Sequence, residues 1–256
     1  MTRKVTMRVF HGEPDEDGVP LGEMVDHEVE LDEGMVVLDV IHRIQAEESP
    51  DLACRWNCKA GKCGSCGAEV NGKPRLMCMT RMNDILDETP AGDPVTVKPM
   101  QTFPLIRDLV VDVSMTYDTD RRITPINGPS NKDWVFHQPE ADRIQEFREC
   151  IECMLCMNTC HVLRDHQMFE QFAGPRFFVR LANLEMHPLD TENRMPEIKE
   201  DFGIGYCNIT RCCTEVCPAG ISITDNAIIP LKERVVTQSY DPLAWFARKL
   251  GIAKSK

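Results

Sequence analysis

The chain has 256 residues, enough for about two domains at the usual roughly 100–200 residues per domain. Its formal net charge of -12 and its aromatic content of 6% exclude a basic face for nucleic acid, so we expect protein partners and no nucleic acid. The N-terminus MTRKVTMRVF lacks an apolar core and a small-residue cleavage site, which predicts an unprocessed, cytoplasmic chain. No apolar run approaches the roughly 18 residues of a spanning helix, so we expect the chain itself not to cross a membrane.

The first third of the sequence predicts a small sheet covered by a helix. Residues 5–9 and 25–31 alternate between apolar and polar, as in two strands of a hairpin around the turn-rich segment 12–22. Segment 36–45 then places Val37, Val40, Ile41 and Ile44 at helical spacing, and Pro50 ends the predicted helix.

A loop rich in cysteine and glycine, residues 54–67, follows this helix. A short alternating stretch at 68–70, a turn and a closing strand at 95–97 complete the pattern. We therefore expect an α+β fold whose first part, residues 1–104, is one compact domain.

Proline-rich residues 105–140 are expected to link two domains and contain one apolar piece, 105–113, that reads as a helix. From residue 141 onward the apolar spacing becomes helical. The second domain, 141–256, is therefore expected to be mainly α-helical, with helices at 144–147, 177–186 and 225–236.

The chain contains thirteen cysteines, and this odd count without a signal peptide favours reduced thiols and metal ligands over disulfides. Cys58, Cys63 and Cys66, followed after eleven residues by Cys78, have the C-x4-C-x2-C…C spacing of a plant-type 2Fe-2S cluster. The glycines of this loop let backbone N–H groups approach the cluster. We therefore expect residues 1–104 to be a β-grasp domain of the plant-type 2Fe-2S ferredoxin kind.

Two alternatives accompany this first group. A structural zinc site commonly pairs two C-x2-C knuckles, whereas this loop supplies three ligands within nine residues and one distant fourth. Cys54 lies outside the spacing, so we interpret it as a small buried apolar residue, with an exchange of ligand roles with Cys58 as the alternative.

The second group, Cys150, Cys153, Cys156 and Cys160, repeats the bacterial ferredoxin run, so we expect the α-helical second domain to be bacterial-ferredoxin-like. A distant third group, Cys207, Cys213 and Cys217, is the same run with one member missing. In two-cluster ferredoxins the fourth cysteine of each run binds the other cluster. We therefore predict two sets of ligands: Cys150, Cys153, Cys156 and Cys217 for a 4Fe-4S cluster, and Cys160, Cys207 and Cys213 for the other.

Thr210 occupies the position of the missing cysteine, three residues after Cys207. A threonine hydroxyl is a poor iron ligand beside thiolates, so the third site is expected to hold a 3Fe-4S cluster. The adjacent Cys212 is one residue out of the pattern. We interpret it as a packing residue, with a role as fourth ligand as the alternative.

In these cysteine groups the sequence resembles the iron-sulfur subunit of succinate dehydrogenase and fumarate reductase. The phrase FPLIRDLVVDVS at 103–114 is similar to a linker phrase of that family, and RWNCKAGKCGSC and CNITRCCTEVC look most like its actinobacterial form. The resemblance implies an electron-transfer subunit of succinate:quinone oxidoreductase, which takes electrons from FAD in a separate flavoprotein subunit and passes them to quinone at a membrane-anchor subunit. It implies a peripheral place on the cytoplasmic face of the cell membrane, with no carbon chemistry in this chain. Quinol:fumarate reductase is the alternative, and a zinc-binding scaffold is the alternative from another class.

The residues after Cys160 and Cys207 depart from the family pattern, which often has a tryptophan pair and a histidine there as quinone contacts. Here the candidate quinone-proximal residues are His161, Arg164, Asp165 and Asn208. The basic, aromatic-containing C-terminal segment from Trp245 to Lys256 is a further candidate contact for lipid or anchor subunit.

Overall fold

The computed structural model describes residues 3–128, 135 and 137–242 and divides the chain into two compact units. Unit 1 comprises Met1–Met115 and Ile151–Thr159, and unit 2 comprises Thr116–Cys150 and Cys160–Lys256. The basic segment from Trp245 to Lys256 lies outside the described residues. The limits 1–104, 105–140 and 141–256 stay a prediction about domains, whereas the units follow spatial contacts and place the segment of Cys153 and Cys156 in unit 1.

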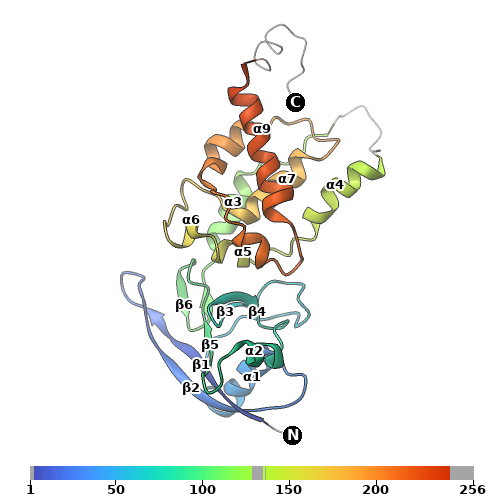
Figure 1. Ribbon diagram of the computed structural model, residues 1–256. Helices are drawn as coiled ribbons and strands as arrows, with labels where there is room; N and C mark the ends of the chain where they lie inside the picture. The colour runs from blue at the N-terminus through green and yellow to red at the C-terminus, as the bar shows by residue number, and fades with distance from the viewer. Residues whose placement is uncertain (1–2, 129–134, 136, 243–256) are drawn as a thin grey trace. The chain divides into compact units, whose positions relative to one another are not determined.

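Unit 1 contains a five-stranded sheet in the order β2-β1-β5-β3-β4 (Figure 1). β1 pairs antiparallel with β2 over its whole length and parallel with β5, and β3 pairs antiparallel with both β4 and β5. The strands are β1 (Arg3–Pro14), β2 (Pro20–Leu31), β3 (Gly67–Val70), β4 (Lys73–Leu76) and β5 (Val95–Lys98). This mixed sheet confirms the predicted α+β architecture of the first part.

Helix α1 (Val37–Glu47) contacts β2 and buries Val37, Leu38, Val40, Ile41 and Ile44 at its apolar positions. The alternate residues of β1 are buried as well, as its sequence pattern predicts. Each such aliphatic side chain removed from water contributes about 1.5–3 kcal/mol. The predicted strands and this helix are confirmed, while β4 and the short α2 (Met82–Glu88) were not predicted.

The predicted helix at 105–113 is wrong, because this stretch forms a small hairpin of β6 (Leu105–Arg107) and β7 (Val110–Val111). Asp108 at the turn has φ 48, which an α-helix cannot contain. Its buried carboxylate accepts hydrogen bonds from the backbone N–H of Gly12 at 2.9 Å and of Ala53 at 2.7 Å. Contacts distant in sequence therefore decide the conformation.

Unit 2 is mainly α-helical, as predicted. Its elements are α3 (Ser114–Arg122, from Thr116 on), α4 (Gln138–Arg148), α6 (His161–Arg164), α7 (Pro175–Glu185), η1 (Glu197–Asp201), η2 (Ile204–Tyr206), α8 (Cys212–Glu215), η3 (Ile223–Ile228) and α9 (Ile229–Tyr240). Phe177 and Phe178 of α7 are fully buried. Among the described residues, no helix is both long and apolar enough to span a lipid bilayer.

Candidate metal centres

The loop that carries Cys58, Cys63 and Cys66 is wound tightly by three residues with left-handed backbone angles. Lys59, Gly61 and Gly64 have φ values of 53, 65 and 70. As a result, backbone N–H groups turn toward the thiols. The N–H groups of Ala60 and Lys62 donate to the Cys58 Sγ at 3.4 and 3.3 Å, and the Cys58 N–H donates to the Cys63 Sγ at 3.5 Å.

The buried half of this group consists of Cys66 and Cys78. The two are within hydrogen-bonding reach of each other, and Cys66 also interacts electrostatically with Cys63. Burial raises the pKa of the Cys66 thiol to about 12, whereas hydrogen bonding, chiefly from Ser65, lowers the pKa of the Cys63 thiol to about 6. Four converging thiols with backbone donors aimed at sulfur fit the donor set of a 2Fe-2S cluster.

Cys54 lies outside this arrangement. Its Sγ is within 3.9 Å of the Arg55 carbonyl oxygen, and burial raises its pKa to about 12. This environment agrees with the interpretation of Cys54 as a packing residue.

The backbone around Cys153 has a distinctive conformation. Glu152 and Met154, on either side, have φ values of 55 and 62, and the short helix α5 (Leu155–Asn158) begins directly afterwards. For residues other than glycine, such angles cost about 1–2 kcal/mol each. These two strained residues set the position of Cys153 in the loop. The buried Cys156 follows one helical turn later.

The loops of the first two cysteine groups touch within unit 1. A Cβ built on Gly64 would lie 2.6 Å from the Cα of Cys153, and one on Gly67 would lie 3.2 Å from the Leu155 side chain. The proposed ligand set Cys150, Cys153, Cys156 and Cys217 is divided between the two units. That set therefore stays a prediction.

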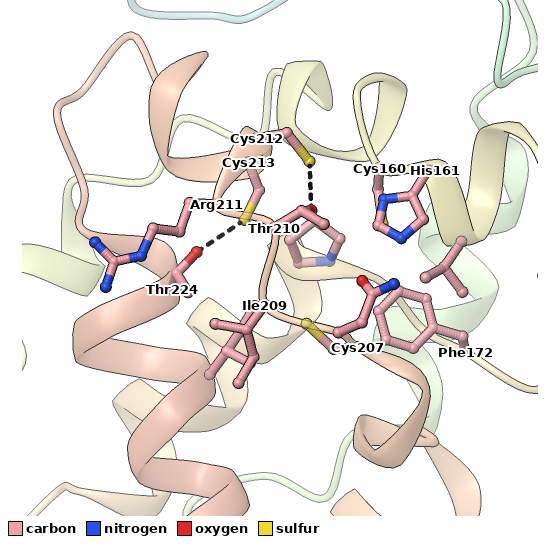
Figure 2. Close-up of a pocket in the computed structure, with 14 residues that line it drawn as sticks. Cys160, His161, Phe172, Cys207, Ile209, Thr210, Arg211, Cys212, Cys213 and Thr224 are labelled. Carbon is pink, nitrogen blue, oxygen red and sulfur yellow. Dashed lines mark hydrogen bonds between the residues drawn. The ribbon is translucent and has the colours of Figure 1, made fainter.

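A pocket in unit 2 contains Cys160, Cys207 and Cys213, the three predicted ligands of the last cluster (Figure 2). The space between atoms at this pocket amounts to about 310 Å³, part of which is open to solvent. Its wall is largely apolar and comprises Val162, Phe172, Pro175, Ile209 and Ile228. A largely apolar pocket with three converging thiols fits an iron-sulfur cluster with three protein ligands.

The backbone around Thr210 repeats that around Cys153. Ile209 and Arg211, on either side of Thr210, have φ values of 61 and 66, and α8 begins directly after them. A β-branched residue such as Ile209 is rarely left-handed, so this conformation is imposed by the loop. The threonine therefore occupies the place that a cysteine has in the other run.

Cys212 also lines the pocket, but its position in the repeated loop corresponds to that of Leu155. Its Sγ lies 3.3 Å from the Thr210 hydroxyl (Figure 2). Cys212 also interacts electrostatically with Cys160 and Cys213, so its interpretation as a packing residue stays a prediction.

Burial sets the protonation of the pocket thiols. It raises the pKa of the Cys160 thiol to about 11 and raises that of Cys213, whose Sγ lies 3.5 Å from the Thr224 hydroxyl. A metal ligand must be a thiolate, so loading of this site releases protons.

In the described part of the chain, no three His, Cys, Asp or Glu side chains form a group able to hold a single metal ion.

Two of the four candidate quinone-proximal residues line this pocket. They are Asn208 and His161, whose Nε2 is buried and has no hydrogen-bond partner among the residues that the structure describes. Arg164 and Asp165 follow on α6 and its end and are not among the lining residues, so the structure does not bring all four together.

Sequence reasoning missed a buried polar cluster in unit 1, formed by Asn158, Glu69 and Thr102. Asn158 is two residues after Cys156, whereas Glu69 and Thr102 are distant in sequence. The only local signal was a polar residue in an apolar stretch, MLCMN, and that signal does not identify its partners.

Comparisons with known proteins match both parts of the chain. The family model described as "2Fe-2S iron-sulfur cluster binding domain" matches residues 6–118, and that described as "4Fe-4S dicluster domain" matches residues 146–221. The chain is 31% identical to the fumarate reductase iron-sulfur subunit of Mycobacterium tuberculosis, over 86% of this chain and 89% of the relative. It is 29% identical to the succinate dehydrogenase iron-sulfur subunit of Bacillus subtilis, over 71% of each.

Among solved structures, a chain of the "Mycobacterium smegmatis Sdh1 complex in the apo form" matches with a TM-score of 0.88. The two sequences are 53% identical, and the match covers 95% of this chain and 100% of that chain. The similarity therefore extends across both cysteine-rich parts.

Proposed function

This chain belongs to the iron-sulfur subunits of the succinate dehydrogenase and fumarate reductase family, and from that premise we propose which electron path it provides. Electrons leave FAD in a separate flavoprotein subunit, pass through 2Fe-2S, 4Fe-4S and 3Fe-4S clusters in this chain, and reach a quinone at a membrane-anchor subunit. The net reaction is succinate oxidation coupled to quinone reduction. The chain is an electron-transfer subunit, and its residues do no carbon chemistry.

The observation that carries this proposal is the pocket around Cys160, Cys207 and Cys213. Three thiols converge there, and Thr210 stands where the other run has Cys153. When bound, iron-sulfur clusters supply one-electron chemistry. The chain's own part is to provide thiolates, exclude water with the apolar wall and donate backbone hydrogen bonds that tune the potential.

The proposed ligand sets have distinct roles. Cys58, Cys63, Cys66 and Cys78 hold the 2Fe-2S cluster; Cys150, Cys153, Cys156 and Cys217 hold the 4Fe-4S cluster; and Cys160, Cys207 and Cys213 hold the 3Fe-4S cluster. The hydrogen bonds to the thiols of the first group support its assignment. Crossed ligation in the other two follows from the bacterial ferredoxin run.

For the quinone end, we assign His161 and Asn208 as the side chains that contact the ring oxygens. Both line the pocket of the third site, and no described residue makes a hydrogen bond with the buried His161 Nε2, which supports a role for this atom toward a ligand. The anchor subunit holds the chain as a peripheral protein at the cytoplasmic face of the membrane.

The test is anaerobic purification of the complete complex, followed by iron analysis and EPR. Two, four and three irons in the three clusters give about nine irons per chain. A colourless complex with bound zinc would refute the electron-transfer function. Exchange of Cys160 for serine should abolish the 3Fe-4S signal and spare the 2Fe-2S signal.

The direction of the reaction is tested separately. Rates of succinate oxidation and fumarate reduction are measured on the same complex with matched quinone and quinol. Succinate oxidation is expected to be faster. Fumarate reduction far in excess of it would assign the complex as a quinol:fumarate reductase and leave the electron path unchanged.

A further inference from the structure

We propose that Asn158 is a positioning residue that clamps the Cys153–Cys156 loop onto strand β3 of the 2Fe-2S domain, and so fixes the distance between the first two clusters. This inference rests on the proposed function, because it takes Cys153 and Cys156 as cluster ligands. Electron transfer slows steeply with distance, so a fixed separation is a functional requirement of the path.

The Asn158 side chain is completely buried and connects two elements of unit 1. Its Oδ1 accepts the backbone N–H of Thr102 at 3.0 Å, and its Nδ2 donates to Glu69 Oε1 at 2.8 Å. The Thr102 hydroxyl returns a hydrogen bond of 3.1 Å to the Asn158 carbonyl oxygen. A backbone N–H can only donate, which fixes the orientation of the amide.

The strand partner of this clamp also connects to the first cluster loop. Glu69 lies in β3, which begins at Gly67, directly after the predicted ligand Cys66. Asn158 ends α5, two residues after the predicted ligand Cys156. The hydrogen bond between Asn158 and Glu69 therefore joins two short segments, and each segment follows directly after a predicted cluster ligand.

Backbone packing at the other end of the loop brings Cys153 against Gly64, in the space that a Cβ would fill. α5 has only four residues, too few to be stable as an isolated helix. The loop also contains left-handed Glu152 and Met154. Its geometry is therefore held by its surroundings, with Asn158 as the buried polar attachment.

If the Asn158–Glu69 hydrogen bond positions the loop, exchanging the donor and the acceptor between positions 158 and 69 should preserve that position. Asn158→Asp keeps an oxygen for the Thr102 N–H but places a second carboxylate against Glu69, which repels it at a buried site. Adding Glu69→Gln restores a donor and an acceptor in reversed order. The double variant should therefore recover the geometry that Asn158→Asp loses, which a simple loss of volume would not allow.

Asn71→Ala is the matched control. Asn71 belongs to the same domain. Its side-chain amide donates to the Thr89 hydroxyl at 2.8 Å and accepts from the Thr96 N–H at 2.9 Å and the Thr96 hydroxyl at 3.5 Å, but these bonds join the β3–β4 turn to β5 and to the end of α2. It reports the effect of lower stability without movement of the Cys153 loop.

The readout is EPR power saturation of the reduced 2Fe-2S cluster in the complete complex, because a nearby reduced 4Fe-4S cluster accelerates its relaxation through space. Asn158→Asp should shift half-saturation to lower power or lose the 4Fe-4S signal, with the 2Fe-2S spin count unchanged. The double variant should return toward wild type, and Asn71→Ala should match wild type. Wild-type saturation in Asn158→Asp, absence of rescue, or the same shift in Asn71→Ala would overturn the clamp. Absence of cluster signals from the wild-type complex would instead refute the proposed function.

Discussion

Gly64 lies directly against Cys153, so that a Cβ on the glycine would approach the cysteine Cα to 2.6 Å. Gly64 also has φ +70. Two separate demands, a left-handed backbone and the lack of a side chain, therefore meet at one residue between Cys63 and Cys66. The close approach joins the loops of the first two predicted clusters.

Gly64→Ala is expected to lower the free energy of unfolding by more than the roughly 1–2 kcal/mol of a left-handed alanine, because the overlap with Cys153 adds to it. Gly72→Ala is the matched control, since Gly72 has φ +73 but nothing within 4 Å of its built Cβ. Chemical denaturation of both variants measures the difference. Equal losses of unfolding free energy in the two variants would show that Gly64 and Cys153 are not packed as described. Iron analysis of Gly64→Ala should in addition show cluster loss.

Asp108 is expected to be a main support of the β6–β7 hairpin. Asp108→Gly keeps the backbone conformation but removes the acceptor of the Gly12 and Ala53 N–H groups, and a hydrogen bond to a charged group contributes about 1.5–3 kcal/mol. We expect a loss of about 3 kcal/mol in unfolding free energy. Asp118→Ala, at an exposed i,i+3 ion pair, should change it little. A small loss at Asp108 would contradict its bridging role.

The same carboxylate shows where sequence reasoning stops. Leu105, Leu109 and Val113 fit a helical face, but Asp108 turns the chain through contacts 55 and 96 residues away. β4 was also not predicted, because it has only four residues and includes Pro74, a residue that is rare within strands. Such elements are defined by their partners more than by their own residues.

The cysteine spacings were informative for the opposite reason. Ligands of one cluster must lie at fixed separations, so their spacing along the chain records the geometry of the site. The structure accordingly brings Cys160, Cys207 and Cys213 to one pocket. The hydrogen bonds of Asn158 leave no comparable pattern in the sequence, because Glu69 and Thr102 are distant from Asn158 and belong to no motif.

His11 is expected to make stability depend on pH. Burial lowers its pKa, and the charge of neighbouring His27 also lowers it, against Asp108, Asp51 and Glu23, which raise it. The folded state thus binds a proton on His11 less readily than the unfolded state, whose pKa is about 6.5. The contribution of uncharged His11 to the free energy of unfolding is therefore fully present above about pH 6.5. It is lost as the pH falls through the lowered folded-state pKa of His11.

His11→Gln tests this pH dependence, since it removes the titrating ring and keeps an N–H donor for the His27 Nε2, which lies 3.1 Å from the His11 Nε2. Unfolding free energies from pH 8 to pH 5.5 should fall less steeply in the variant than in the wild type. His137→Gln, at an exposed position, should keep the wild-type slope. Parallel curves for wild type and His11→Gln would rule out the contribution of His11.

Thr210→Cys is expected to convert the third cluster from 3Fe-4S to 4Fe-4S, because the left-handed residues on either side of Thr210 place it where Cys153 stands in the other run. Iron should rise by about one atom per chain, and the EPR signal of the oxidised 3Fe-4S cluster should disappear. Thr210→Ser, which keeps a hydroxyl at the same position, is the control for the substitution itself. Cys212→Ser keeps a partner for the Thr210 hydroxyl, now 3.3 Å from sulfur, and should retain the 3Fe-4S signal. An unchanged signal in Thr210→Cys, or a signal lost in Cys212→Ser, would move the vacant ligand position from Thr210 to its neighbour.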